Sequence, residues 1–408
     1  MTRARTSTLL AALALTGVAL SIGLPRLGGG SGTGTADVKP ASPSSLAFAA
    51  LVDDAASGAL PVEERAELVA RLRALGPKAL ARFLDESVAK DAVEAPRLVA
   101  LECLDGCATA REFALLVRLA SPQSTPSDAL RAALRSAMVH TLERDPRAQD
   151  ELVPAWRESE PLRLELVAAV GERGEPAGLE FLAWATDQHE EHLERAVAEN
   201  CLRLAPRART PEEREALERL SVLLESSDLS CVQTMAAALA RAHVESAIPA
   251  LTQLLASESR GVRERARRSL QDLTGLALGD TPQRWQAWFE SERAWFANEA
   301  PGVLEALASD DDAQVLSALR VLGGRRLNRD ELAVPIVDVL AHPTPAVRLA
   351  ATSALAALGS PLAVAPLVDL LEDEDEAVAQ GAWSALRKLT GLDLALDADA
   401  WRERVAAE

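Results

Sequence analysis

An internal repetition limits what this chain can fold into more than any other feature of its sequence. Residues 247–285 align without a gap to residues 363–401, and 14 of the 39 aligned positions are identical. The most specific identities are a Leu-Thr-Gly-Leu run and a later tryptophan, namely Leu273–Leu276 with Leu389–Leu392 and Trp285 with Trp401. Repetition of this kind is typical of a chain built as an array of similar units.

A shorter period lies inside the long one. Four apolar positions recur at an offset of 31, namely Val347, Ala351, Leu355 and Leu358 as Val378, Ala382, Leu386 and Leu389. Steps of four, four and three residues put these positions on one face of an α-helix. Each such helix follows another short apolar stretch, with turn residues such as Glu372–Asp375 between the two. The sequence therefore predicts helix pairs of about 30 residues, which must stack because one pair cannot bury its apolar stripe alone.

The amino-acid composition agrees with an all-α fold. The 408 residues include no Tyr, 6 Phe and 7 Trp, whereas β-sandwiches and barrels depend on aromatic and β-branched residues. The formal net charge of -18 repels a polyphosphate backbone, so nucleic-acid binding is not expected. Only 4 Cys are present, which is too few for a disulfide-stabilised scaffold.

The best-formed repeats resemble the HEAT repeat. The residues that support the resemblance are Val347–Gly359, Pro361, Ala363 and Pro366–Leu371. Their period is similar to the short HEAT-like form that also occurs in phycobilin lyases. The resemblance covers about residues 230–290 and 335–390, and helical periodicity alone supports it over 46–225. It implies an α-α superhelix, a HEAT-like solenoid of stacked helical hairpins that serves as a binding scaffold, and no particular activity.

The predicted organisation has five parts. Residues 1–26 form a signal peptide or an N-terminal membrane anchor, and residues 27–45 form a flexible linker rich in Gly, Ser and Pro. Divergent helical repeats occupy 46–225. HEAT-like repeats and a Trp-rich helix occupy 226–300, and further HEAT-like repeats occupy 301–408.

The N-terminal prediction depends on the run Leu9–Leu24, which has 16 uncharged residues and follows Arg3 and Arg5. A helix of this length is roughly 24 Å long, shorter than the roughly 30 Å hydrocarbon core of a bilayer. The run therefore suits a signal peptide, and an uncleaved membrane tether is the second interpretation. Both place the bulk of the chain outside the cytoplasm, periplasmic or secreted. A buried helix of a cytosolic domain is the remaining alternative.

Five of the 13 aromatic residues lie within 12 positions, namely Trp285, Trp288, Phe289, Trp295 and Phe296. Their spacing puts the last four on one face of a helix. If part of that face is exposed, these residues are the predicted protein-binding site, because Trp dominates interface hot spots. The alternative is a helix buried between two blocks of repeats, since aromatic side chains on a helical stripe usually belong to a core.

Arg263 and Arg348 each follow the valine that opens the second helix of a repeat. The resemblance to HEAT repeats implies that each pairs with an acid of a neighbouring repeat, and a guanidinium suits bidentate carboxylate binding. The candidate acids are Asp310–Asp312 and Asp373. Capture of an external anion is the alternative.

No catalytic set can be identified in the sequence. The cluster His189–His192 lacks the four-residue spacing of a two-His zinc helix, so no metal or cofactor is predicted. We predict a non-catalytic protein–protein interaction scaffold or adaptor of the cell envelope. Two alternatives stay open: an enzyme similar to bilin lyases, and a nucleic-acid-binding solenoid that uses the arginine-rich face Arg260–Arg268.

Overall fold

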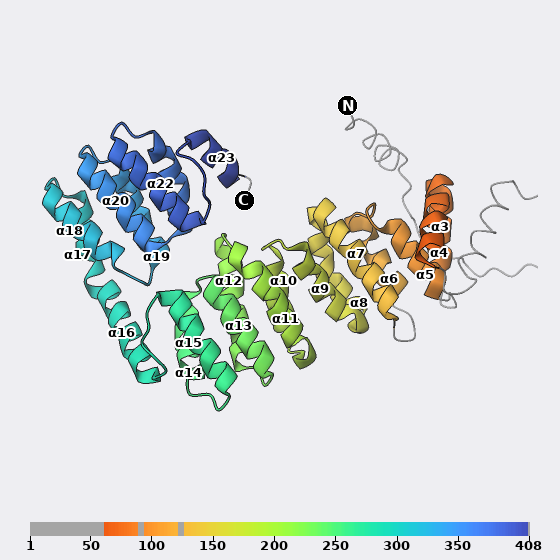
Figure 1. Cartoon of the computed structure of the whole chain (residues 1–408). Helices are drawn as coiled ribbons and strands as arrows, with labels where there is room; N and C mark the ends of the chain where they lie inside the picture. The colour runs from red at the N-terminus through yellow and green to blue at the C-terminus, as the bar shows by residue number, and fades with distance from the viewer. Residues whose placement is uncertain (1–60, 89–93, 121–125, 407–408) are drawn as a thin grey trace, which may run out of the picture. The chain divides into compact units, whose positions relative to one another are not determined.

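The computed structural model describes residues 61–88, 94–120 and 126–406. Within these ranges all regular structure is α-helix or 3-10 helix and no residue lies in a strand, which confirms the predicted all-α fold class. Helices of successive repeats stack as an α-solenoid of helical hairpins (Figure 1). The predicted signal or anchor at 1–26 and the linker at 27–45 lie outside the described residues. In the part that the structure describes, no helix is long and apolar enough to span a bilayer.

The described residues divide into two compact units, one that ends at Phe181 and one that begins at Leu182. In the first unit, α3, α5, α7 and α9 pack against one another in succession, and α4 and α6 lie beside them. The helix bounds are α3 Val62–Ala74, α4 Pro77–Val88, α5 Glu94–Leu104, α6 Ala110–Ala120, α7 Asp128–Arg144, α8 Leu152–Glu158 and α9 Arg163–Arg173. The helix α10, Gly178–Thr186, spans the division. The predicted divisions at 225 and 300 stay predictions.

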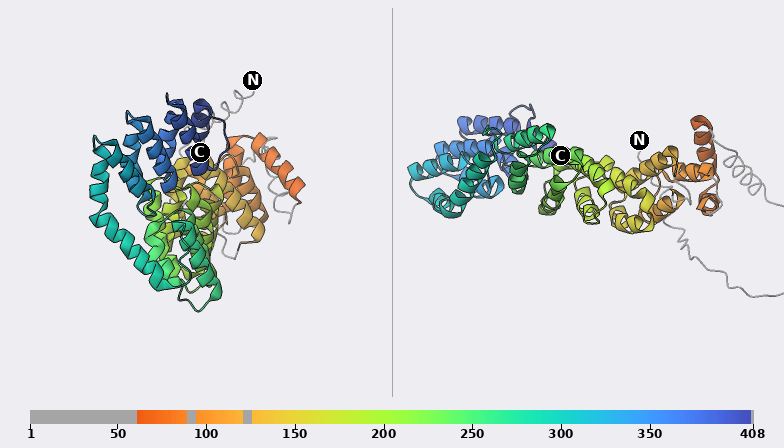
Figure 2. Two further views of the ribbon diagram at one scale, coloured as in Figure 1. Left: turned by 60° about the vertical axis from the view of Figure 1, so that its left-hand side comes forward. Right: turned by 90° about the horizontal axis from the view of Figure 1, so that it is seen from below.

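The second unit contains two stacks, one on either side of α16 in the sequence. In the first stack α11, α13 and α15 pack in succession, and in the second stack α18, α20 and α22 do so. Figure 2 shows the blue helices of the second stack side by side in both views. The bounds are α11 Glu191–Leu204, α12 Pro211–Leu220, α13 Leu229–Arg241, α14 Ile248–Leu254, α15 Arg260–Thr274, α16 Pro282–Asn298, α17 Ala300–Glu305, α18 Asp312–Gly323, α19 Arg329–Asp338, α20 Pro345–Leu358, α21 Val364–Asp369, α22 Glu376–Thr390 and α23 Ala398–Ala406.

The repeated Leu-Thr-Gly-Leu run ends a helix at both of its occurrences. Gly275 after α15 and Gly391 after α22 have φ angles of +70° and +72°, which glycine adopts without steric cost. The threonine before each glycine donates to the carbonyl four residues earlier and accepts from the amide two residues later. These bonds join Thr274 to Leu270 (2.7 Å) and Leu276 (3.2 Å), and Thr390 to Leu386 (2.8 Å) and Leu392 (3.1 Å). The repeated run is therefore a helix stop.

The repeated tryptophans have the same role in both stacks. Trp285 near the start of α16 and Trp401 in α23 are fully buried. Each indole N–H donates to the backbone carbonyl six residues earlier, at 2.8 Å for Gly279 and 2.9 Å for Ala395. Each tryptophan thus fixes the loop that follows the helix stop, which accounts for its repeated spacing within the chain.

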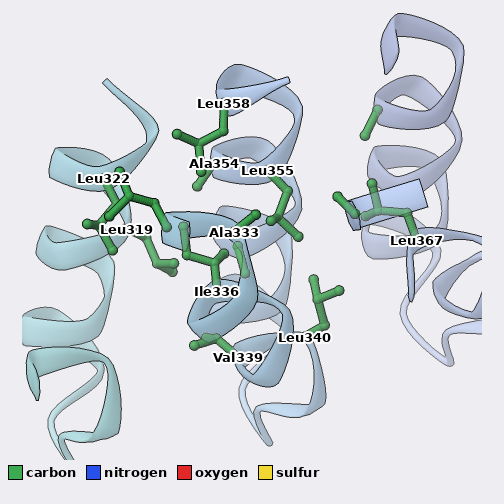
Figure 3. Packing of buried hydrophobic residues seen from close by; sticks show 14 of the residues in the cluster. Leu319, Leu322, Ala333, Ile336, Val339, Leu340, Ala354, Leu355, Leu358 and Leu367 are labelled. Carbon is green, nitrogen blue, oxygen red and sulfur yellow. The ribbon is translucent and has the colours of Figure 1, made fainter. Parts of the chain in front are cut away.

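Six of the eight apolar positions predicted from the period belong to the core of the second stack, and Leu389 packs against it partly buried (Figure 3). Leu355 and Leu358 of α20 are 0% and 1% exposed. Figure 3 shows Leu319 of α18 and Ile336 of α19 close to these leucines. Burial of each such side chain contributes about 1.5–3 kcal/mol. The core therefore depends on side chains from several repeats at once.

Candidate functional site

Two of the five predicted aromatic residues serve the fold. Trp285 closes its loop, and Trp295 belongs to the hydrophobic core of the second stack. The Arg325 guanidinium lies 3.6 Å from the centroid of the Trp295 ring. Glu292 of α16 pairs with Arg325 at 3.2 Å. These contacts fix the segment after α18 to α16.

The other three aromatic residues, Trp288, Phe289 and Phe296, are half-buried. Trp288 packs edge-on against Trp285, with ring centroids 6.1 Å apart at 88°. Arg293 lies 5.9 Å from the ring centroid of Phe289, and Phe296 packs against the core. The accessible part of the aromatic face is therefore confined to these three residues, and their binding of a partner stays a prediction.

The segment 324–330 includes the loop after α18 and the first two residues of α19, and is here called the α18–α19 connection. It contacts residues far away in the sequence. The backbone N–H of Asn328 donates to Glu245 at 2.6 Å, across 83 positions. Asp330 pairs with Arg214 of α12, across 116 positions. The connection thus joins the second stack to helices and turns of the first.

Arg329 is the centre of this junction. Its guanidinium donates to the carbonyl of Leu273 at 3.0 Å and to Nδ1 of His243 at 2.9 Å, and it lies 3.6 Å from Glu245. Desolvation is the main cause that lowers the pKa of His243, and the positive charge of Arg329 lowers this pKa further. The imidazole is therefore neutral at pH 7 and can accept the hydrogen bond. Desolvation also raises the pKa of Glu245, against the hydrogen bond from Asn328.

A cleft of about 300 Å³ lies beside the α18–α19 connection. It is bordered by the C-terminal ends of helices from both stacks and by basic side chains of the connection. The lining residues are His243, Asp272–Gly275, Arg326, Arg329, Ala356–Gly359, Lys388 and Leu389. Sequence reasoning missed this site, because the periodic helix ends come together through contacts of the α18–α19 connection that have no counterpart in the other described repeats.

Basic side chains outnumber acidic ones in this cleft, on a chain whose net charge is -18. Asp272 is the acid among the lining residues, against Arg326, Arg329 and Lys388. Arg329 already donates to Leu273 and His243. Arg326 and Lys388 are exposed, and neither has an ion-pair or hydrogen-bond partner within the described ranges. The arrangement can bind an anionic group.

Arg348 confirms the predicted ion pair between neighbouring repeats. Its guanidinium donates to both carboxylate oxygens of Asp373, at 2.8 and 2.7 Å, and the two side chains are 8% and 7% exposed. It also donates to the carbonyls of His342 and Pro343, at 3.0 and 3.1 Å. The hydrogen bond from Arg348 lowers the pKa of Asp373. With its donors used in this way, Arg348 is not a site for an external anion.

The same prediction is wrong for Arg263. Its guanidinium donates to two backbone carbonyls of the preceding turn, at 2.7 and 2.8 Å, and it forms no ion pair with Asp310–Asp312 or any other described acid. Asp373 stands 25 positions after Arg348. The residue 25 positions after Arg263 is Trp288. The acidic turn is missing there because α16 takes the place of the next hairpin.

Acids compensate part of the arginine-rich face Arg260–Arg268. Glu264 pairs with Arg268 at 2.6 Å and with Arg267 at 3.6 Å. Asp280 pairs with Arg267 at 3.3 Å. The face is therefore less basic than the sequence alone indicates.

In the cluster His189–His192, a carboxylate oxygen of Glu190 lies 3.9 Å from Nε2 of His192. Among the described residues, no group of three or more His, Cys, Asp or Glu side chains is placed to bind a metal ion. Burial raises the pKa of the Cys103 and Cys201 thiols to about 12. A thiol with a raised pKa stays protonated at neutral pH.

A second hollow, of about 290 Å³, lies beside α7 in the first unit and includes Ser136 and His140. Asp105 accepts a hydrogen bond from Ser136 Oγ at 3.0 Å and another from His140 Nδ1 at 2.5 Å. The carboxylate thus lies between the hydroxyl and the imidazole, whereas an activated serine needs the imidazole between the other two. The separation of 31 positions between Asp105 and Ser136 equals the repeat period. This spacing is the signal that could have identified the contact between α5 and α7.

Comparison with known proteins gives one family match. Residues 300–398 match the family model of HEAT repeats, which confirms the resemblance from α17 to α22. No curated protein matches the sequence. For residues 46–299 the resemblance stays a prediction.

Several solved structures are similar to the chain at low superposition scores. An engineered protein has 17% identity and a TM-score of 0.33, with 86% of this chain and 96% of that chain covered. Importin beta has 16% identity and a TM-score of 0.32, with 84% of this chain and 50% of that chain covered. Human deoxyhypusine hydroxylase in complex with glycerol has 18% identity and a TM-score of 0.21, with coverage of 77% and 97%. At these scores the similarities do not bear on the function of this chain.

Proposed function

We propose that this chain is a non-catalytic scaffold of the cell envelope that binds other proteins. The observation that supports the proposal is the match to HEAT repeats at residues 300–398, in a stack with a continuous hydrophobic core. Stacked helical hairpins present a preformed surface, so a partner binds without a large cost in ordering the scaffold.

Two neighbouring surfaces of the second unit are the proposed binding regions. One is the half-buried aromatic face of α16, with Trp288, Phe289 and Phe296. The other is the cleft beside the α18–α19 connection. Arg325 links the two, because it stacks on Trp295 of α16 while its neighbour Arg326 lines the cleft.

A site-specific photo-crosslink tests the scaffold function. A benzophenone amino acid at position 289 of the full chain replaces one aromatic side chain by another at a half-buried site. The matched control carries it at Gln253, an exposed residue of α14. After illumination of intact cells, we expect one or a few proteins crosslinked from position 289 and not from 253. Absence of an adduct from 289, or the same proteins from both positions, would contradict the proposal.

The proposed location outside the cytoplasm depends on the run Leu9–Leu24. N-terminal sequencing of the purified protein, together with cell fractionation, tests it. A signal peptide gives a mature chain that begins after Leu24, and an uncleaved anchor gives a full-length chain in the membrane fraction. A full-length chain in the cytosolic fraction would contradict the proposed location and leave the scaffold function intact.

A further inference from the structure

We infer that the cleft beside the α18–α19 connection binds an acidic peptide segment of a partner protein, and that Arg326 and Lys388 contact its carboxylates. The inference rests on the proposed scaffold function and specifies the chemistry of the partner. No property of the HEAT-repeat fold requires it, since the cleft forms where α16 interrupts the array.

The first argument is that two cations of the cleft lack the acids that other cations of the second stack have. Ion pairs join Arg325 to Glu292 (3.2 Å), Arg348 to Asp373 (2.7 Å) and Arg402 to Glu372 (2.7 Å). Arg326 and Lys388 have no such partner within the described ranges, although the chain has 61 acidic residues against 43 basic ones. In this acidic chain, two unpaired cations in one cleft form a local site for negative charge.

The second argument is that the cleft is held in place before a ligand arrives. The residues on both sides of Arg326 are anchored, because Arg325 pairs with Glu292 and Asn328 donates to Glu245. Arg329 donates to the carbonyl of Leu273 at the end of α15, and its Nη1 lies 3.7 Å from the position of a Cβ added at Gly359, which follows α20. A preformed site loses less entropy on binding than one that must be ordered.

The third argument concerns the kind of anion that fits. A volume of about 300 Å³ lies at the lower end of ligand pockets, so the cleft accommodates a short extended segment rather than a duplex. The C-terminal ends of α15 and α20 border it and carry partial negative charge with carbonyl acceptors. A peptide supplies backbone N–H donors to these carbonyls together with carboxylates for the cations, whereas a phosphate group supplies acceptors alone. The net charge of -18 also opposes a long polyanion.

Fluorescence anisotropy with defined probes tests the inference on the full chain. The probes are labelled hexaglutamate, hexaglutamine and a single-stranded hexanucleotide. The test variant is Arg326→Glu with Lys388→Glu. The control is Arg260→Glu with Arg284→Glu, which changes the net charge equally at two exposed arginines outside the cleft. Circular dichroism verifies that both variants keep their helix content.

We expect hexaglutamate to bind and hexaglutamine not to bind. The cleft variant should weaken hexaglutamate binding about tenfold or more, because it replaces two attractive charge contacts by repulsive ones. A tenfold loss corresponds to about 1.4 kcal/mol. The control variant should weaken binding less than about twofold. Equal loss in both variants, or equal binding of the hexanucleotide, would overturn the inference. A specific crosslink from position 289, together with unchanged hexaglutamate binding by the cleft variant, would overturn the cleft assignment and leave the scaffold function intact. Absence of the crosslink, together with no binding of hexaglutamate by the unmodified chain, would contradict the scaffold function as well.

Discussion

Arg348 and Arg263 occupy equivalent positions in two repeats but have different partners. Arg348 donates to a carboxylate of the next repeat, whereas Arg263 donates to backbone carbonyls, although the local sequences are alike. The difference lies in the next element of the chain, because α16 replaces the hairpin that would supply an acid to Arg263. The local sequence thus predicts which arginine donates, and the element that follows in the chain determines which group accepts.

We expect Asp373→Asn to lower the free energy of unfolding by about 2 kcal/mol at pH 7, because it weakens charge-assisted hydrogen bonds of a buried pair. The hydrogen bond from Arg348 lowers the pKa of Asp373 in the folded state. The stabilisation is therefore complete above the unfolded pKa of about 3.9 and disappears as the pH falls through the lower folded pKa. Urea unfolding at pH 7 and pH 3 measures this, with exposed Asp338→Asn as control. If Asp373→Asn lowered the free energy of unfolding as much at pH 3 as at pH 7, the charged Arg348–Asp373 pair would not be the source of the stabilisation.

The helix stop at Gly391 allows a test of backbone conformation alone. Gly391 has φ +72°, Gly302 lies in α17 without a positive φ, and an added Cβ meets no atom within 4 Å at either position. We expect Gly391→Ala to cost about 1 kcal/mol through the left-handed backbone. Gly302→Ala should leave stability unchanged or raise it by up to about 1 kcal/mol through helix propensity. Thermal unfolding of both variants is the measurement, and shifts of the same sign would contradict the explanation.

At the scale of helices, the sequence predicts what is periodic. The stripe that includes Leu355 is buried as predicted, because the second helix of each repeat must bury the same face. The burial of Trp295, in contrast to the half-buried Trp288, Phe289 and Phe296, was not predictable, since all four satisfy one helical spacing. The contacts of the α18–α19 connection were not predictable either, because partners 83 and 116 positions apart occur once and leave no period.

Removal of one side chain should loosen this connection. We expect Arg329→Ala to increase hydrogen exchange of the Asn328 amide about tenfold, because the variant loses bonds worth about 1–1.5 kcal/mol to Leu273 and His243. Hydrogen-exchange mass spectrometry over peptides that cover 324–330 measures the change. The control is Arg320→Ala, an exposed arginine of α18. Equal exchange in both variants would show that Arg329 does not hold the connection.

At the scale of the whole molecule, an array of repeats is stabilised by neighbours rather than by one shared core. The hydrophobic cluster of the second stack runs from Trp295 to Trp401, and the bonds described between that stack and the first are polar. Stability in such an array is the sum of local terms and nearest-neighbour terms. A defect in one stack should therefore act most strongly within that stack.

Leu355→Ala tests this expectation, because Leu355 is fully buried in α20. The cavity should cost about 2–5 kcal/mol. Hydrogen exchange should increase most in α18, α20 and α22 and least in α11 and α13, which pack with α15 in the other stack. Leu362→Ala, at a leucine that is 47% exposed in the same stack, should cost less than about 0.5 kcal/mol. Equal loss of protection in both stacks after Leu355→Ala would mean that residues 182–408 unfold as one cooperative block, and the polar junction would then transmit as much stability as a hydrophobic core.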